Sequence, residues 1–353
     1  MNENWWKQAV FYHIYPKSFQ DTDGDGIGDI RGVISRLDYL ATLGIDAVWL
    51  SPVYRSPMVD GGYDISDYCD IDPVFGTLDD FRELLKQAHD KGIRIIMDLV
   101  MNHTSDWHPW FAASRSSVDN PKRDWYIWNE GRNGKSPNNW RTNFLERAWR
   151  RDAVTEQFYY HSFFREQPDL NWRNEDMKQA FFENIRFWLD MGVDGFRLDV
   201  INMIMKDNLL RNNSLSNRSK VYNRNQPETY GIVREFRTLL NEYAGTTSVG
   251  EIYVLPPGDP KLAASFLGNG SDMLHLAFDF SLLFCTWNAR QYYRTIQSYY
   301  DALPPAGWAC FAFSNHDVGR SLNRFYRVHH ALEKAKLIAV LLMTERNAVY
   351  LLR

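Results

Sequence analysis

The chain has 353 residues, 44% apolar and 15% aromatic, which is enough to bury one large core. Its formal net charge of −4 gives no basic surface of the kind that binds nucleic acid or anionic membranes. No run of about 18 apolar residues is present, so a membrane span is not expected. The composition favours a soluble globular protein that binds neutral small molecules.

The cysteine count and the first residues bear on location. Cys69, Cys285 and Cys310 are an odd number of cysteines without close metal-ligand spacing. A disulfide framework is therefore not expected, and a reducing compartment is. The start of the chain has neither the basic residues nor the apolar stretch of a secretion signal. We therefore expect a cytoplasmic protein.

Short apolar runs rich in β-branched residues alternate with longer amphipathic segments. The expected strands are residues 10–15, 47–51, 94–100, 195–200, 247–251, 273–278 and 309–314, with a short eighth within 347–352. The expected helices include residues 30–43, 78–91, 175–191 and 228–243. Strict alternation predicts an α/β protein with a parallel sheet, and the number of units predicts a (β/α)₈ TIM barrel.

Two stretches interrupt this alternation. Residues 104–172 are aromatic, polar and rich in Pro and Asn, and they are too long for an ordinary loop after a strand. We predict a small domain inserted there, after the third strand, with the barrel formed by residues 1–103 and 173–353. Residues 206–228 follow the fourth strand and would lie at the mouth of the barrel.

Acidic residues stand at the ends of four expected strands. They are Asp98, Asp199, Glu251 and Asp317. Barrel enzymes collect their catalytic groups at the carboxyl ends of the strands, so four acids there favour function over capping. Arg197 and Asp199 share one face of a strand because they are two residues apart. Alone they could be a structural ion pair, or a nucleophile beside its orienting cation.

Paired carboxylates without a serine or cysteine nucleophile pattern point to glycoside hydrolysis. One carboxylate would attack or stabilise the anomeric carbon, and the other would protonate the leaving oxygen. We assign the first role to Asp199 and the second to Glu251. Arg197 would keep Asp199 ionised while the apolar neighbours of Glu251 raise its pKa, so that the two pKa values separate.

Five segments then carry a family resemblance. Four of them resemble, in order, the signature regions of the α-amylase superfamily of glycoside hydrolases: residues 98–103, 195–200, 249–251 and 314–317. Gln167-Pro168-Asp169-Leu170-Asn171-Trp172 resembles the additional region of its oligo-1,6-glucosidase and α-glucosidase branch. The resemblance implies retaining hydrolysis with Asp199 as nucleophile, Glu251 as general acid and base, and Asp317 as transition-state stabiliser.

The resemblance also implies how the terminal glucose is bound. The expected substrate-binding residues are Asp60, Tyr63, His103, Phe144, Phe163, Gln167, Arg197 and His316. Tyr63 would stack on the sugar ring, while Arg197 would orient the nucleophile and Asp98 would support Arg197. A Tyr or His near a strand end is often only a packing residue, and it is the motif context that favours the functional interpretation.

Residues 21–29, Asp-Thr-Asp-Gly-Asp-Gly-Ile-Gly-Asp, alternate acidic side chains with glycines, which suits Ca²⁺. The loop is not an EF-hand, because its twelfth position is Gly32 rather than Glu. The alternative is a solvated acidic turn. The resemblance implies a structural calcium ion held by Asp21, Asp23, Asp25, the carbonyl of Ile27, and Asp29.

The resemblance ends near Thr344. The family normally continues into an eighth helix and a C-terminal β-sandwich, so we expect a barrel that is incomplete at its C-terminus. The favoured function is an exo-acting α-glucosidase acting on the α-1,4 or α-1,6 bonds of short oligosaccharides. The alternatives are a sucrose isomerase or glucosyltransferase with the same three acids, a noncatalytic amylase-like module, and a fragment that does not fold stably.

Overall fold

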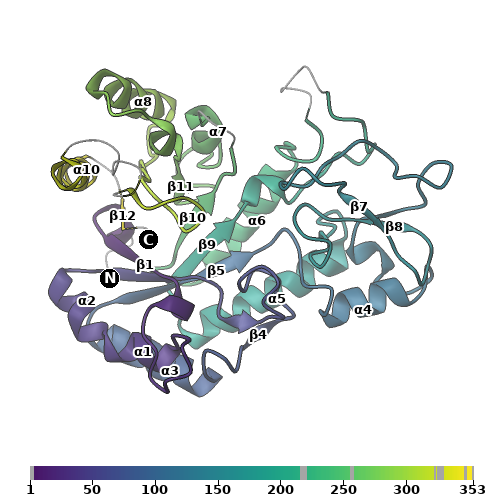
Figure 1. The fold of residues 1–353 in the computed structure, drawn as a ribbon, viewed down its shortest axis with the longest axis horizontal. Coiled ribbons are helices and arrows are strands. Elements are labelled where there is room, and N and C mark those ends of the chain that lie inside the picture. The colour runs from purple at the N-terminus through teal and green to yellow at the C-terminus, as the bar shows by residue number, and fades with distance from the viewer. Residues whose placement is uncertain are drawn as a thin grey trace.

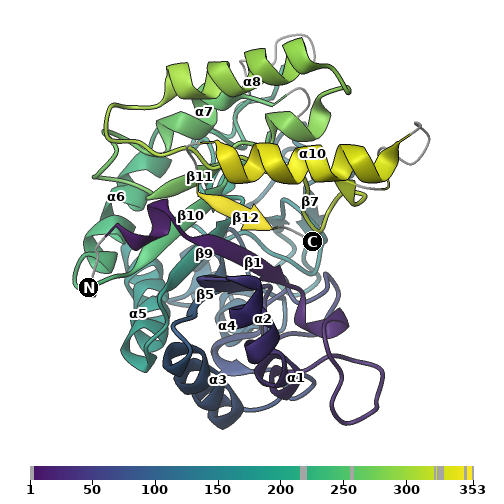
Figure 2. The ribbon, with the colours of Figure 1, turned by 90° about the vertical axis from the view of Figure 1, so that its left-hand side faces the viewer.

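The computed structural model describes residues 4–214, 221–254, 258–321, 323, 330–345 and 348–351. Its centre is a seven-stranded sheet in the order β11-β10-β9-β5-β2-β1-β12, curled into a barrel (Figures 1 and 2). The strands are β1 (Val10–Ile14), β2 (Ala47–Leu50), β5 (Arg94–Val100), β9 (Gly195–Asp199), β10 (Thr247–Glu251), β11 (Leu276–Phe278) and β12 (Val349–Leu351). All six ladders are parallel, as predicted for a TIM barrel.

The segment 309–314, expected as the seventh strand, forms no ladder of its own. It is held instead by an isolated parallel bridge between Asp279 and Phe311. On its other side, the N–H of Ala348 donates to the carbonyl of Ala309 at 3.0 Å. β12 then pairs with β1, so backbone hydrogen bonds run right round the ring of strands. The predicted short eighth strand is therefore β12.

Helices cover the outside of the barrel. They are α1 (Ile30–Ser35), α2 (Leu37–Leu43), α3 (Leu78–Asp90), α5 (Glu175–Met191), α6 (Thr229–Leu240), α7 (Pro260–Ser265), α8 (Ala289–Ala302) and α10 (Ala331–Thr344). The helix expected over residues 30–43 is divided at Arg36, where φ is −107° and ψ is 4°. Within the described parts of the chain, we find no helix long and apolar enough to cross a membrane.

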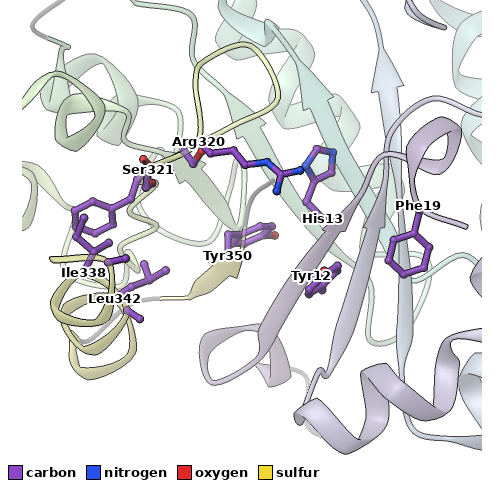
Figure 3. Close-up of a pocket in the computed structure, with 12 residues that line it drawn as sticks. Tyr12, His13, Phe19, Arg320, Ser321, Ile338, Leu342 and Tyr350 are labelled. Carbon is purple, nitrogen blue, oxygen red and sulfur yellow. Dashed lines mark hydrogen bonds between the residues drawn. The ribbon is translucent and has the colours of Figure 1, made fainter. Parts of the chain in front are cut away.

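The ring of helices has a gap between α10 and the α1–α2 pair, because no helix follows β12 in the described residues. A cavity of 480 Å³ lies there. Tyr12 and Phe19 line one side of it and Ile338 and Leu342 of α10 the other, with Tyr350 of β12 between them (Figure 3). Within the described residues, the strands thus form a ring, whereas the helices leave this cavity uncovered.

Residues 104–172 form a separate group of elements, at the right of Figure 1. These are α4 (Pro109–Ser116), η3 (Arg123–Trp125), and an antiparallel sheet of β6 (Trp128–Asn129), β8 (Phe158–Tyr160) and β7 (Trp149–Arg151). The stretch after the fourth strand packs on them, since Trp140 Nε1 donates to the carbonyl of Arg211 at 2.8 Å. Residues 215–220 of that stretch lie outside the described residues.

A few short elements were not predicted. They are the antiparallel pair β3 (Tyr54–Arg55) and β4 (Asp67–Ile71), and the 3₁₀ turns η1 (Trp5–Lys7), η2 (Pro16–Ser18), η4 (Ile201–Met203) and η5 (Ser281–Phe284). η1 precedes β1, and the others lie in the connections between the barrel elements.

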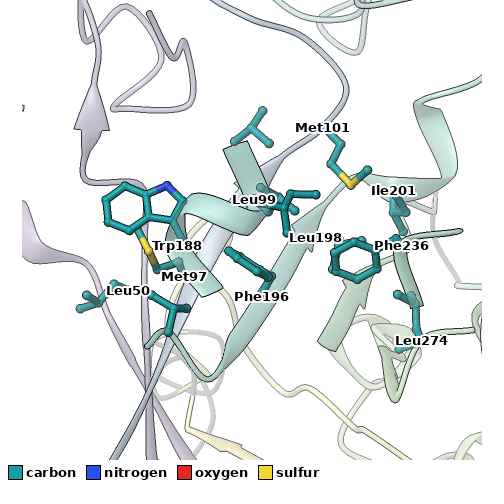
Figure 4. Packing of buried hydrophobic residues seen from close by; sticks show 14 of the residues in the cluster. Leu50, Met97, Leu99, Met101, Trp188, Phe196, Leu198, Ile201, Phe236 and Leu274 are labelled. Atoms are coloured by element: carbon teal, nitrogen blue, oxygen red, sulfur yellow. The ribbon is translucent and has the colours of Figure 1, made fainter. Parts of the chain in front are cut away.

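The core between the strands and α5 and α6 fixes which way β9 faces. Phe196 and Leu198 are fully buried on the outer side of β9, and the Phe196 ring lies 6.4 Å from that of Phe236 in α6 (Figure 4). Because side chains alternate along a strand, Arg197 and Asp199 face the inside of the barrel. Gly195 permits this packing, since a Cβ there would lie 2.0 Å from the carbonyl oxygen of Thr247.

Candidate active site

A cavity of 460 Å³ opens where β9 and β10 end, between the barrel and the 104–172 segment. Nine of the residues named from the sequence line it: Asp60, Tyr63, His103, Phe144, Phe163, Asp199, Glu251, His316 and Asp317. Asp98, Arg197 and Gln167 lie behind its wall and are almost fully buried. One cavity therefore brings together residues spread over most of the sequence.

Arg197 is the centre of the charged groups beneath this cavity. Its Nη1 donates to Asp199 Oδ1 at 2.6 Å and to Asp98 Oδ1 at 2.8 Å, and its Nη2 donates to Glu251 Oε2. Trp49 Nε1 adds a hydrogen bond to Asp98 at 3.2 Å. One guanidinium thus faces three buried carboxyl groups, and it can balance only one of their charges.

Burial raises the pKa of all three carboxyl groups, because the charged form loses its water. The pKa rises to about 6 for Asp98 and to about 7 for both Asp199 and Glu251. Burial raises the pKa of Asp199 and of Glu251 alike and the same guanidinium opposes both rises, so these shifts do not distinguish the two roles that the sequence predicted. The three carboxyl groups titrate as a coupled set, and their raised pKa values favour a protonated carboxyl among them, which is what an acid next to a nucleophile requires.

The backbone turns sharply directly after Asp199. Val200 has φ 36° and ψ 43°, a left-handed conformation that is costly for a β-branched residue. The turn starts η4 and brings the N–H of Val200 to 3.4 Å from Glu251 Oε2. The chain thus keeps a strained residue between its two central carboxyl groups.

Tyr63 and His316 join opposite sides of the site. Their rings are nearly parallel, at 8°, with centroids 5.6 Å apart. The Tyr63 hydroxyl donates to Asp98 Oδ2 at 3.0 Å and lies 3.0 Å from His316 Nε2. His316 Nε2 is in turn 3.5 Å from Asp317 Oδ1, whose side chain is 59% exposed. Asp317 is the most open of the three predicted catalytic acids.

The 104–172 segment supplies an aromatic side of the cavity and a support for Asp60. The rings of Phe144 and Phe163 are 6.2 Å apart, and Phe144 is half exposed. Gln167 Nε2 donates to Asp60 Oδ2 at 2.8 Å. Burial raises the pKa of Asp60, although the hydrogen bond from Gln167 opposes this.

Some lining residues were not predicted as site residues. They are Tyr15, Val59, Gly61, Asn143, Phe164, Val200 and Tyr253. Tyr15 directly follows β1 and Tyr253 lies two residues beyond β10, so the strand-end rule that found the acids could have found both. Asn143 and Phe164 are in connections of the 104–172 segment, where no sequence pattern marks them.

The loop of residues 21–29 brings three of its four acidic residues together. One carboxylate oxygen from each of Asp21, Asp23 and Asp29 lies within 4.8 Å of the others. Asp29 also caps α1 through Gly32 N–H at 2.7 Å, and Asp25 accepts from Ile27 N–H at 2.7 Å. The all-oxygen donor set fits a hard cation such as Ca²⁺ at Asp21, Asp23 and Asp29.

Fold and site together define the family. The model of the α-amylase catalytic domain matches residues 13–352. The chain is 42% identical to a probable α-glucosidase of Rhizobium meliloti and 43% identical to an oligo-1,6-glucosidase of Parageobacillus thermoglucosidasius, over 99% of its own length in both cases. This chain therefore belongs to the α-amylase family.

Solved structures agree with this assignment. A crystal structure of the α-glucosyl transfer enzyme XgtA superposes with a TM-score of 0.92 at 40% identity, covering 99% of this chain and 68% of that one. The trehalulose synthase MutB from Pseudomonas mesoacidophila gives 0.92 at 36% identity, covering 99% and 65%. The chain spans 66% of the Rhizobium relative and 65% of the Parageobacillus relative.

Proposed function

We propose that this chain carries the catalytic site of a retaining, exo-acting α-glucosidase that releases glucose from short oligosaccharides. One observation supports this most. Asp199 and Glu251 end two neighbouring strands, both line the 460 Å³ cavity, and both are held by Arg197. Carboxyl groups about 5 Å apart characterise retaining glycosidases, and a guanidinium that reaches both groups favours such a short separation.

In this proposal Asp199 attacks the anomeric carbon while Glu251 gives its proton to the glycosidic oxygen. The C1–O bond breaks, the aglycone leaves as an alcohol, and an ester forms between glucose and Asp199. Glu251 then takes a proton from water, which attacks C1 and frees Asp199. Asp317 stabilises the positive charge at C1, and Asp60, His103 and His316 hold the sugar hydroxyls.

The test is hydrolysis of p-nitrophenyl α-glucoside, with the anomer of the released glucose followed by NMR. Asp199→Asn and Glu251→Gln should each lower kcat by at least about a thousandfold and still melt cooperatively. Asp279→Asn is the matched control, since Asp279 is a buried acid just after β11 that does not line the cavity. Normal turnover in either test variant, or first release of β-glucose, would contradict the proposal.

Isomerisation or glucosyl transfer is the second candidate, and it is favoured by the likeness to XgtA and MutB. The two functions share the glucosyl ester and differ in whether water or a sugar hydroxyl takes the glucose. Incubation with maltose, isomaltose and sucrose separates them. Glucose as the main product supports hydrolysis and also reveals the preferred linkage, whereas new disaccharides support transfer or isomerisation.

We also propose that the loop of residues 21–29 binds a structural Ca²⁺ ion through Asp21, Asp23 and Asp29, with Asp25 and the carbonyl of Ile27 completing the set. The loop contributes no residue to the cavity, so the ion would stabilise the fold without taking part in the reaction. Calcium should raise the melting temperature, and the double variant Asp21→Asn, Asp23→Asn should abolish that rise. An equal rise in the double variant would exclude this site. A cytoplasmic location stays a prediction.

A further inference from the structure

A buried lysine and aspartate lie behind the cavity, and the proposed reaction uses neither. Lys206 Nζ is 2.5 Å from Asp169 Oδ2, and the two side chains are 2% and 0% exposed. Ser162 adds hydrogen bonds to Asp169 from its N–H at 2.7 Å and from its hydroxyl at 2.6 Å. Burying two charges costs desolvation free energy, so a role of the pair is to be sought among the residues that it contacts.

The pair fixes the amide of Asn102. Lys206 Nζ donates to Asn102 Oδ1 at 2.7 Å, while Asn102 Nδ2 donates to Asp169 Oδ2 at 3.0 Å. A lysine can only donate and a carboxylate can only accept. Rotation of the amide would set its NH₂ against the ammonium and its oxygen against the carboxylate. The orientation of Asn102 is therefore determined by two charges.

Asn102 in turn determines which nitrogen of His103 can carry a proton. Its Nδ2 lies 3.1 Å from His103 Nδ1, and since Nδ2 is a donor, Nδ1 must accept. Burial lowers the pKa of His103 to about 4, so the neutral ring has a single N–H. His103 Nε2 has an acceptor, the carbonyl oxygen of Tyr63 at 3.2 Å. The proton therefore belongs on Nε2.

A second donor meets Nε2 at the same point. Gln167 Nε2 is 2.9 Å from His103 Nε2, and its amide is oriented by Asp60 Oδ2 and by the N–H of Phe164, which donates to Gln167 Oε1 at 3.0 Å. Nε2 thus has both an acceptor, the Tyr63 carbonyl, and a donor, Gln167, whereas Nδ1 has a donor alone, so the single proton of the ring still belongs on Nε2. His103 lines the cavity, so a ligand hydroxyl beside it would compete with the Tyr63 carbonyl for that proton.

We propose that Lys206 and Asp169 are positioning residues that lock Asn102 and thereby keep His103 as an Nε2–H donor toward a ligand hydroxyl. That this hydroxyl belongs to a glucoside rests on the proposed function. The tautomer does not, because it follows from contacts within the chain.

The tautomer can be measured by NMR of the chain labelled with ¹⁵N in its imidazole rings, with His103 assigned by comparison with His103→Gln. We expect an unprotonated Nδ1 and a protonated Nε2. In Lys206→Met the lock is lost, so the Nδ1 signal should shift toward the protonated position. In Asn102→Asp an acceptor faces Nδ1, so the proton should move to Nδ1.

Lys178→Met is the matched control. Lys178 is also mostly buried and paired, with Glu175 at 2.9 Å and Glu235 at 2.6 Å, but it lies on α5. Its loss should leave the signals of His103 unchanged. For p-nitrophenyl α-glucoside, kcat/KM should fall about tenfold in Lys206→Met and stay near the wild-type value in the control.

Two results would overturn the inference: a wild-type His103 protonated on Nδ1, or a cooperatively melting Lys206→Met protein with unchanged His103 signals. If Lys206→Met does not fold, Asn102→Asp decides alone, and retention of the Nε2–H tautomer there contradicts the lock. A chain with the expected signals but no hydrolysis would contradict the proposed function and leave the inference standing.

Discussion

Two arcs of the barrel are held together very differently. In the first, β1, β2, β5, β9 and β10 pair over four or five residues each, and we call this the long-ladder arc. In the second, the closing arc, β11 and β12 have three-residue ladders, and residues 309–314 between them have an isolated bridge. The gap in the helical layer lies beside this closing arc.

The site uses both arcs, and its acids differ accordingly. Asp199 and Glu251 end long-ladder strands and have side chains 9% and 6% exposed, whereas Asp317 follows the closing arc and is 59% exposed. Two carboxyl groups are thus positioned by the sheet and the third by a loop. The comparison teaches that the long-ladder arc holds the carboxyl groups whose burial is unfavourable, while the closing arc adds one exposed carboxylate.

The largest expected effect comes from removing the charge at the centre of the long-ladder arc. Arg197→Met leaves three buried carboxyl groups without a cation and should lower the free energy of unfolding by about 3–5 kcal/mol. Urea unfolding measures this. Arg186→Met, which breaks a partly exposed ion pair with Glu242, should lose only a small fraction as much. Equal losses of unfolding free energy in the two variants would show that Arg197 stabilises the fold no more than an exposed ion pair does.

The next effect tests the closing arc. Tyr350 is 1% exposed, and its ring stacks on Phe11 with centroids 4.2 Å apart. Tyr350→Ala should cost about 3 kcal/mol and speed hydrogen exchange in β12 and residues 309–314 while β5 and β9 stay protected. Phe196→Ala, at the centre of the long-ladder arc, should instead loosen the whole barrel. Uniform loss of protection in both variants would mean that the arcs unfold as one unit.

A smaller effect is the pH dependence of stability. Burial raises the pKa of Glu251 from 4.5 to about 7. A carboxyl with a raised folded-state pKa stabilises the fold below its unfolded pKa, and this contribution is lost as the pH rises toward the folded value. The free energy of unfolding of Glu251→Gln, measured by urea unfolding, should therefore exceed that of the wild type by about 1 kcal/mol at pH 8 and by less at pH 5. A gain in Glu251→Gln that is as large at pH 5 as at pH 8 would contradict this prediction.

The smallest effect concerns the contact that joins the arcs. Tyr63→Phe removes the hydroxyl that contacts Asp98 and His316, at a cost of about 1 kcal/mol. Hydrogen exchange in residues 309–314 should become faster. Tyr54→Phe is the control, because its hydroxyl donates to the carbonyl of Asp98 within the long-ladder arc. If both variants change exchange in the closing arc alike, Tyr63 does not link the arcs.

The long-ladder arc could be predicted from the sequence, whereas the pairing in the closing arc could not. The long-ladder strands have dense apolar runs between helix signals, and all five were predicted within two residues of their observed ends. Residues 309–314 are equally apolar. Their backbone pairing, however, depends on Asp279 and Ala348, which are distant in the sequence, so no local pattern predicts it. The break at Arg36 in the predicted first helix has no Gly or Pro to mark it.

The site follows the same rule. Acids at the ends of regular strands were found because the barrel fixes where such ends lie. The lock on His103 was not found, although Asn102 and Asp169 lie in segments with a family resemblance and Lys206 begins an irregular stretch. Their meeting depends on how the 104–172 segment folds back over the barrel, which the sequence does not show.

The pairing of β12 with β1 has a consequence for how the chain is made. β1 is the first barrel strand to leave the ribosome, and β12 is the last of the described strands. One edge of β1 therefore stays without its partner until residues 349–351 have been made, and an open edge invites pairing with other chains. Nascent chains stalled before residue 349 should accordingly be the ones that chaperones hold longest.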